Sequence, residues 1–451
     1  MKRDSHRDPK TPRPGKATWT RRAFVSAMAG ATASATGLSL LTSGCSSPRA
    51  LSGRASGERR RRVAIIATEV RIHSHAQHFI DRFLEGYGWR GAWHHPAMDL
   101  AALYVDQFPA NDLARERSQR FGVPIYPTIA EALTLGGSKL AVDGVLIIAE
   151  HGKYPRNEMG QTLYPRYRFF NEVVKVFEAS GRAVPLFQDK HLSTKWEECV
   201  EQVADSRRLG FPFLAGSSLP VTWRIPSIEM PLNTLLRESV CVCYGGVDSY
   251  DFHGLETAQC MSERRAGGEA GIKSVTAARG DRLWPMLAER DLTRRLVSAA
   301  LARSHTMRAP AGRTFAAPTL DWIRQSSPEA VGYFIEHYDG FRTTMFLLNG
   351  LVQDFTYAGL EKGNGKIISC QMHLPMPTRV STTADFFNPL VNNIERMIED
   401  RRAPYRVERT LLTSGMTLSA VESLHSGGVK IDTPELRIAY TPPAQSTFWR
   451  A

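Results

Sequence analysis

Residues 181–219 have the sequence GRAVPLFQDKHLSTKWEECVEQVADSRRLGFPFLAGSSL, and this stretch decides the fold. An apolar strand at 184–187 is followed by a charged turn, an amphipathic helix and a second apolar strand. This order and spacing predict two parallel strands joined by a crossover helix. The turn Asp189-Lys190-His191 ends the first strand, and the carboxyl ends of parallel strands border the crevice where open α/β sheets bind ligands. Lys190 is therefore predicted to point into a ligand-binding crevice.

The same alternation of strands and helices is found upstream of this stretch. Apolar runs typical of buried strands lie at 62–67, 99–105 and 144–149. Helical patterns separate or follow them at 75–87, 113–121, 128–135 and 167–180. Strands alternating with helices of this length predict a doubly wound parallel sheet, so we expect a Rossmann-like domain over residues 62–218.

The pattern changes after residue 219. Residues 332–361 are rich in strand-forming residues and are interrupted by Asp339-Gly340 and Asn349-Gly350. Both dipeptides favour tight hairpin turns, so this region predicts an antiparallel meander. Further strands are expected at 238–244 and 271–278, and helices at 284–304, 387–402 and 411–425. We therefore predict an α/β fold whose second domain, residues 219–451, has an open and mainly antiparallel sheet.

The positive charge of the chain is concentrated at its amino terminus. The 451 residues carry a formal net charge of +12. Residues 1–62 contain fourteen Lys or Arg and three Asp or Glu, so that only +1 remains for residues 63–451. A nearly neutral folded part offers no basic surface for a phosphate backbone, which excludes nucleic acid as an expected partner.

The amino-terminal segment has the features of an export signal. Arg21-Arg22 is followed by a weakly apolar run to Leu41, the order found in twin-arginine (Tat) signals. We expect a signal at residues 1–45 and a flexible tether at 46–61, with a disordered basic tail as the alternative. Cys45 follows small residues and fits a lipid acceptor, so the predicted location is periplasmic, either free or anchored as a lipoprotein. Nothing after residue 62 has the composition of a membrane span.

The other cysteines do not form a recognisable framework. They are odd in number, most lie in apolar runs, and no C-x-x-C pair is present, so buried free thiols are expected. The histidines His73, His75 and His78 are dense, but their spacing is not a known ligand spacing. We therefore predict no metal site.

Several landmarks occur in the order of one known family. Residues 120–124 read RFGVP, residues 142–145 read VDGV, and SAVESLHSGGVKIDTP lies near the end of the chain. With these landmarks the chain, from about residue 63 onward, resembles the glucose–fructose oxidoreductase and inositol dehydrogenase (Gfo/Idh/MocA) family. The turn Asp189-Lys190-His191 lies where that family has its Glu-Lys-Pro tripeptide. The resemblance implies a Rossmann domain, a second domain that covers the nicotinamide of NAD or NADP, a sugar or polyol substrate and a homo-oligomer.

One motif of that family is altered. After the first strand the family has G-x-G-x-x-G-x-x-H, whereas residues 67–75 read ATEVRIHSH and keep only the histidine. Side chains at Glu69 and Ile72 crowd the approach of a pyrophosphate, and Glu69 adds a negative charge, so the usual mode of NAD(P) binding is in question. The cofactor-binding residues that the resemblance implies are Thr68, Glu69, His75, Asp106, Glu150 and Lys190.

Two segments carry the candidate catalytic residues. Oxidation of a secondary alcohol needs a base and a positive group that stabilises the alkoxide, and Lys190 can supply both. Residues 245–256, GGVDSYDFHGLE, resemble the family's G-G-G-x-x-x-D-x-G-x-H-x-x-D segment. His253 and Glu256 share one helix face there, so the acid can orient the imidazole. The predicted catalytic residues are Lys190, His253, Asp189, Glu256 and, as a substitute acid, Asp251; the alternative for each is a structural role.

Two functions remain open from the sequence. The first is an exported oxidoreductase that transfers hydride between NAD(P) and a sugar or polyol hydroxyl. The second is a fold relative that has lost the usual dinucleotide site and carries out a non-redox reaction on carbohydrate, or only binds a ligand. The unusually long segment between Glu150 and Arg168 lies at the predicted crevice, where long loops are often functional.

Overall fold

The computed structural model describes residues 59–308, 318–376, 383–445 and 447–448. The predicted export signal, Arg21-Arg22 and Cys45 lie outside these residues, so export and lipidation stay predictions. Residues 59–451 form one compact unit. Of the described helices, none is both long and apolar enough to cross a membrane.

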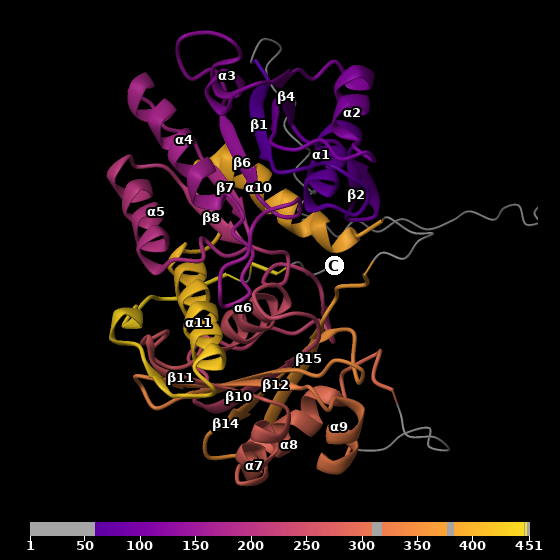
Figure 1. The fold of residues 1–451 in the computed structure, drawn as a ribbon, viewed down its shortest axis with the longest axis vertical. Helices are drawn as coiled ribbons and strands as arrows, with labels where there is room; N and C mark the ends of the chain where they lie inside the picture. Colours follow the sequence, from indigo (N-terminus) through magenta and orange to yellow (C-terminus); the bar gives the residue numbers. More distant parts are fainter. Residues whose placement is uncertain (1–58, 309–317, 377–382, 446, 449–451) are drawn as a thin grey trace, which may run out of the picture. The chain divides into compact units, whose positions relative to one another are not determined.

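The first half of this unit contains a six-stranded parallel sheet with helices on both faces (Figure 1). Its strand order is β5-β4-β1-β6-β7-β8, and every neighbouring pair is parallel. The strands are β1 (Arg61–Ala67), β4 (Met98–Val105), β5 (Ile125–Tyr126), β6 (Gly144–Ile148), β7 (Leu186–Asp189) and β8 (Phe213–Gly216). The helices are α1 (His75–Glu85), α2 (Ala114–Phe121), α3 (Ile129–Thr134), α4 (Arg166–Ser180) and α5 (Trp196–Arg208). The predicted doubly wound sheet is confirmed, because continuous apolar runs such as β1 and β6 are buried on both faces.

A short hairpin that was not predicted follows α1. It consists of β2 (Tyr87–Trp89) and β3 (Ala92–His94). Its two turn residues, Arg90 and Gly91, have positive φ values of 52° and 75°, as a tight hairpin turn requires.

The second half contains an eight-stranded sheet of order β16-β11-β12-β13-β10-β14-β15-β9. Its strands are β9 (Arg224–Ile225), β10 (Leu236–Cys243), β11 (Ile272–Arg279), β12 (Val331–His337), β13 (Arg342–Leu347), β14 (Phe355–Glu361), β15 (Ile367–Met372) and β16 (Ile431–Asp432). All neighbouring pairs are antiparallel except β10 and β13. This confirms a second sheet that is mainly antiparallel.

The predicted meander is correct at its first turn and wrong at its second. Asp339-Gly340 joins the antiparallel pair β12 and β13. The chain after Asn349-Gly350 does not return beside β13, because β10 lies between β13 and β14. The Asn349 side chain accepts a hydrogen bond from the backbone N–H of Gly245 at 2.7 Å and donates one to its carbonyl at 2.9 Å. This pair ties the end of β13 to the end of β10, so the chain passes β10 and pairs on its other side.

The predicted helix at 284–304 is two helices, α7 (Leu283–Ala288) and α8 (Asp291–Leu301). The non-helical backbone of Arg290, with φ −118° and ψ 76°, separates them. A further helix, α9 (Leu320–Ser326), precedes β12.

Three helices of the second half position the candidate site. Helix α6 (Tyr250–Ser262) follows β10, and α11 (Glu408–His425) packs against α6 and β11. Helix α10 (Asn388–Asp400) lies with the parallel sheet instead, as Figure 1 shows for this orange helix. A Cβ atom on Gly144 of β6 would lie 2.6 Å from Cδ1 of Ile398, and the Tyr87 hydroxyl donates to Glu395 at 2.5 Å. The two halves thus share one core.

Candidate functional site

A cavity of about 210 Å³ lies where the carboxyl ends of β6 and β7 meet the start of α6. Five residues predicted from the sequence line it: His75, Glu150, Asp189, Lys190 and His253. Imidazoles, the hydroxyls of Ser217, Ser218 and Ser249, and apolar side chains such as Phe387 complete its wall. The crevice predicted at the end of β7 is therefore present and is lined from both halves of the unit.

Lys190 of the first half meets His253 of the second half in this cavity. Lys190 has a φ of 75°, and its backbone N–H donates to the carbonyl of Gly216 at 3.1 Å, which turns its side chain out of the sheet. Its Nζ is hydrogen-bonded to Nε2 of His253. Because an ammonium group only donates, this contact assigns the acceptor role to Nε2 and the proton of the neutral imidazole to Nδ1.

The hydrogen-bond chain continues from His253 into the interior. Nδ1 of His253 lies 2.9 Å from Oγ of Ser217, whose hydroxyl donates to Oε2 of Glu256. The backbone N–H of Ser217 donates to Oε1 of Glu256 at 2.9 Å. Glu256 is 1% exposed, and burial raises its pKa to about 7. The carboxyl group of Glu256 therefore changes its charge near neutral pH, and the side chains of Ser217 and His253 link it to Lys190.

Ser217 was not predicted from the sequence. It lies immediately after β8, at the same sheet edge as Lys190, and this position is the one feature of the sequence that could have indicated a site residue. Serine is too common after a strand for that position to single it out, and its partner Glu256 is 39 residues away.

His75 and Asp189 form a second pair in the cavity. Nδ1 of His75 lies 2.6 Å from Oδ2 of Asp189. Asp189 is fully buried, and burial raises its pKa to about 6. Burial, followed by the positive charge of Lys190, lowers the pKa of His75 to about 3, so the imidazole is neutral and donates to the carboxylate. This pair fixes the orientation of the His75 ring, and His75 is the one residue of the family's glycine-rich motif that this chain retains.

Glu150 is held by a buried arginine. Arg166, at the start of α4, donates to Oε2 of Glu150 at 2.8 Å and contacts Nε2 of His191 at 2.9 Å. Burial favours the neutral acid, but the charges of Lys190 and Arg166 outweigh it and lower the pKa of Glu150. The cavity is thus lined by one ammonium group, that of Lys190, and by two carboxyl groups, those of Glu150 and Asp189, while Arg166 bonds Glu150 from outside the lining.

Five predicted residues lie outside the cavity wall: Glu256, described above, and Asp106, Asp251, Thr68 and Glu69. The carboxylate of Asp251 accepts from the backbone N–H groups of Ser249 and Phe252 and from the Tyr333 hydroxyl at 2.8 Å, so it caps α6 and faces its own half. Thr68 donates to the carbonyl of Glu150 at 2.7 Å, and Glu69 pairs with Arg71 at 2.6 Å. Asp106 accepts hydrogen bonds from Tyr154 and Arg168. Their proposed roles toward a ligand remain predictions.

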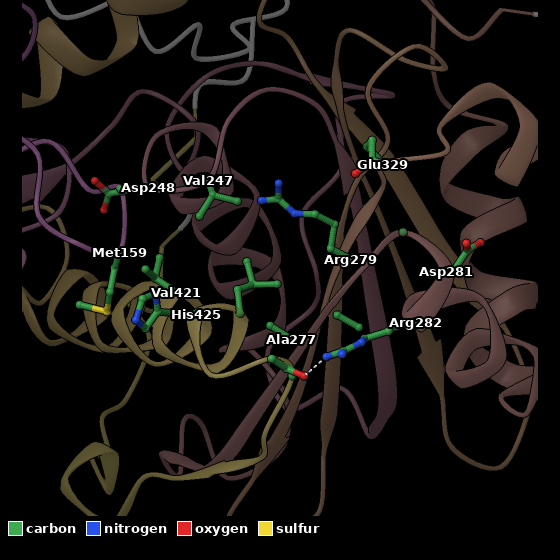
Figure 2. A pocket seen from close by; sticks show the side chains of 16 residues that line it. Met159, Val247, Asp248, Ala277, Arg279, Asp281, Arg282, Glu329, Val421 and His425 are labelled. Carbon is green, nitrogen blue, oxygen red and sulfur yellow. Dashed lines mark hydrogen bonds between the residues drawn. The ribbon is translucent and has the colours of Figure 1, made fainter.

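A larger cavity of about 640 Å³ is bordered in part by Met159 and Gly160 of the long segment (Figure 2). Met159 and Asp248 border it on one side and Arg279 and Arg282 on another, and Arg282 donates to the carbonyl of Gly427. None of the residues predicted from the sequence lines it, and its charges are mixed. We therefore place the candidate site in the smaller cavity. Within the described ranges, no group of three or more His, Cys, Asp or Glu is arranged to hold a metal ion.

The buried imidazoles predict sensitivity to acid. Burial and the nearby Arg82 charge lower the pKa of His78 to about 2, whereas in the unfolded chain it is about 6.5. Only the unfolded chain takes up this proton, so the stabilisation is complete above pH 6.5 and is lost as the pH falls below it. Between pH 7 and pH 5 this one group lowers the free energy of unfolding by about 2 kcal/mol.

The variant His78→Phe removes this titration and keeps an aromatic ring against Phe387, whose ring centroid lies 4.9 Å away. Urea denaturation at the two pH values is expected to show a loss in His78→Phe that is about 2 kcal/mol smaller than in the unmodified chain. The exposed His305, changed to Phe, serves as the control and should leave the loss unchanged. Equal losses in His78→Phe and the unmodified chain would contradict the assignment.

Comparison with known proteins supports the fold. No protein-family model matches the sequence, and no curated protein matches it either. Among solved structures, GenD2 from gentamicin A biosynthesis in complex with NAD has a TM-score of 0.52 and 11% identity, over 83% of this chain and 97% of that one. Myo-inositol dehydrogenase from Lactobacillus casei in complex with NAD(H) and myo-inositol has a TM-score of 0.52 and 10% identity, over 85% and 99%. A probable dehydrogenase from Thermotoga maritima has a TM-score of 0.50 and 10% identity, over 83% and 99%.

These identities are low, so the likeness establishes the fold and nothing finer. The fold is that of the Gfo/Idh/MocA-type dehydrogenases, which confirms the fold implied by the resemblance in the sequence.

Proposed function

We propose that this chain, built on the Gfo/Idh/MocA dehydrogenase fold, is an enzyme that transfers a proton at a hydroxyl group of a small sugar or polyol. The observation that carries this proposal is the contact between Lys190 and His253 in the wall of the cavity. The two side chains come from different halves of the unit, and both line the same cavity. Their juxtaposition at the carboxyl end of β7 is the arrangement that acid–base chemistry needs.

Lys190 and the hydrogen-bond chain behind it have separate roles in this proton transfer. Lys190 binds the hydroxyl oxygen, and as the free amine it accepts the hydroxyl proton. His253 and Ser217 connect Lys190 to Glu256, whose pKa of about 7 lets it hold a proton or release it near neutral pH. As the ammonium, Lys190 stabilises the negative charge that develops on the oxygen.

The cavity suits a compact ligand that both donates and accepts hydrogen bonds. Its volume of about 210 Å³ lies below the roughly 300–1,000 Å³ of sites for drug-sized ligands. The neutral imidazole of His75 donates from Nδ1 to Asp189 and leaves Nε2 as an acceptor, whereas the neutral imidazole of His151 can donate or accept; both match hydroxyl groups. The apolar surfaces of Leu374 and Phe387 match the C–H faces of a sugar or cyclitol ring.

A second candidate is the oxidoreductase that uses NAD or NADP on the same hydroxyl. The observation that favours it is the fold, because two structural neighbours were solved with NAD or NAD(H), one of them together with myo-inositol. In that reaction the dinucleotide would take the hydride, and Lys190 and His253 would keep the roles given above.

Binding of a polyol tests the proposal. Calorimetric titration of the full chain with myo-inositol and with glucose is expected to show saturable binding of at least one of them. Lys190→Met should weaken that binding at least about tenfold, because a hydrogen bond to a charged group is lost from a buried site. The exposed Lys195, which pairs with Glu198 at 3.1 Å, provides the control Lys195→Met, expected to bind as the unmodified chain does. Equal affinity of Lys190→Met and the control would refute the role of Lys190.

A further inference from the structure

We infer that residues 150–165 of this chain occupy the place that its fold gives to the ribose of a dinucleotide, and that the chain binds no free NAD or NADP. In Rossmann-like folds, an acidic residue near the end of the second strand of the nucleotide-binding unit accepts hydrogen bonds from a ribose, and the bare amino terminus of the first helix binds the pyrophosphate. Here Asp106 follows β4, the strand beside β1, and α1 follows β1. Both groups are present, but both are already bonded within the chain.

The carboxylate of Asp106 accepts three hydrogen bonds. Oδ1 accepts from the Tyr104 hydroxyl at 2.7 Å and from Arg168 at 2.9 Å, and Oδ2 accepts from the Tyr154 hydroxyl at 2.7 Å. Burial disfavours the charge, but these bonds outweigh burial and lower the pKa of Asp106. A ribose could bond to this carboxylate only by displacing Tyr154 or Arg168.

The segment that contributes Tyr154 is itself folded in place. The backbone of Lys153 accepts from and donates to the side-chain amide of Gln107, at 3.1 and 2.9 Å. Asn157 and Gln161 close a turn through bonds between their side chains and backbones at 2.9–3.0 Å. The Gln161 side chain then donates to Asp248 of the second half at 3.0 Å. The segment therefore spans from the Asp106 carboxylate to the second half.

The amino terminus of α1 is closed by its own side chains. Oγ of Ser74 accepts from the N–H groups of Arg71 and Gln77, at 3.0 and 3.3 Å. Oε1 of Gln77 accepts from the N–H of His73 at 2.7 Å. Amides that a pyrophosphate would need are thus already bonded, and the buried side chain of Glu69, paired with Arg71 at 2.6 Å, stands where the family has a glycine.

The first experiment measures dinucleotide binding directly. Calorimetric titrations of the full chain with NAD⁺, NADH, NADP⁺ and NADPH, each to several millimolar, are expected to show no saturable heat. The variant Glu69→Gly with Ile72→Gly restores two of the family's glycines, and it too should show none, because Asp106 stays bonded to Tyr154. Saturable binding by the unmodified chain overturns the inference as a whole. Binding by the glycine variant alone overturns the part assigned to residues 150–165.

The second experiment measures how residues 150–165 are held. In Tyr154→Phe, hydrogen exchange at the amides of Gly160 and Gln161 should be about tenfold faster, because a bond to a charged carboxylate is lost. Tyr167→Phe is the matched control, since its hydroxyl bonds to the carboxylate of Glu201 away from this segment. Unchanged exchange in Tyr154→Phe contradicts the inference.

These outcomes are separable from those of the proposed function. The polyol titration with Lys190→Met tests the cavity chemistry, and neither experiment above requires a polyol. A chain that binds polyol but no dinucleotide supports both conclusions. A chain that binds both supports the oxidoreductase candidate and overturns the inference.

Discussion

Arg166→Met is expected to lower the free energy of unfolding by about 3–5 kcal/mol, because it leaves a buried carboxylate without its partner. Arg166 is 3% exposed, and its guanidinium bonds both Glu150 and His191. Methionine fills much of the same volume but supplies no donor. The negative charge of Glu150 would then be compensated mainly by Lys190, with smaller contributions from His151 and His75.

The size of this loss can be checked by guanidinium chloride denaturation at pH 7. The exposed ion pair of Arg120 with Glu85, at 3.2 Å, provides a matched control. Arg120→Met should cost no more than about 1 kcal/mol, as exposed pairs contribute little. Adding Glu150→Gln to Arg166→Met should recover part of the loss, because the unpaired charge is removed. Equal losses in Arg166→Met and Arg120→Met would show that Arg166 does not stabilise a buried charge.

The first half of the fold could be predicted because each of its signals is local. Buried apolar runs alternate with helical patterns, and the right-handed crossover rule then leaves a parallel sheet as the arrangement. The second half depends on a contact that no local pattern shows. Asn349-Gly350 has the composition of a hairpin turn, yet the side chain of Asn349 bonds to Gly245, more than a hundred residues away. That contact, and not the dipeptide, decides which strand lies beside β13.

The part of the candidate site that lies at the carboxyl ends of the parallel strands could be predicted from the sequence. Lys190 directly follows β7, and the carboxyl ends of β1, β6 and β7 meet at one edge, so its convergence with Glu150 and His75 follows from topology. His253 was predicted from the resemblance as a second catalytic residue, but its direct contact with Lys190 was not. Asp251 was expected beside His253, but it caps α6, because successive residues at the start of a helix point in different directions. Sequence spacing alone does not distinguish a capping acid from one that faces a cavity.

Gly216→Ala is expected to lower the free energy of unfolding by about 2–6 kcal/mol, combining backbone strain of about 1–3 kcal/mol with overpacking of about 1–3 kcal/mol. Gly216 has a φ of 113°, a backbone conformation that L-residues with a side chain rarely adopt. A Cβ atom there would lie 2.4 Å from Oε1 of Glu256. Relief of this clash would push Glu256 away from Ser217 and break the chain that leads to Lys190.

Gly181→Ala separates backbone strain from the clash with Glu256. Gly181 ends α4 at a φ of 59°, and a Cβ there would meet no atom within 4 Å, so the loss should be only about 1–2 kcal/mol. If Glu256 is what opposes a side chain at 216, then Gly216→Ala combined with Glu256→Ala should be less destabilised than the sum of the two single variants. The four free energies, measured by denaturation, form a double-mutant cycle. Additive losses would mean that Glu256 does not press on Gly216, and the close packing that holds Ser217, Glu256 and His253 together would lose its support.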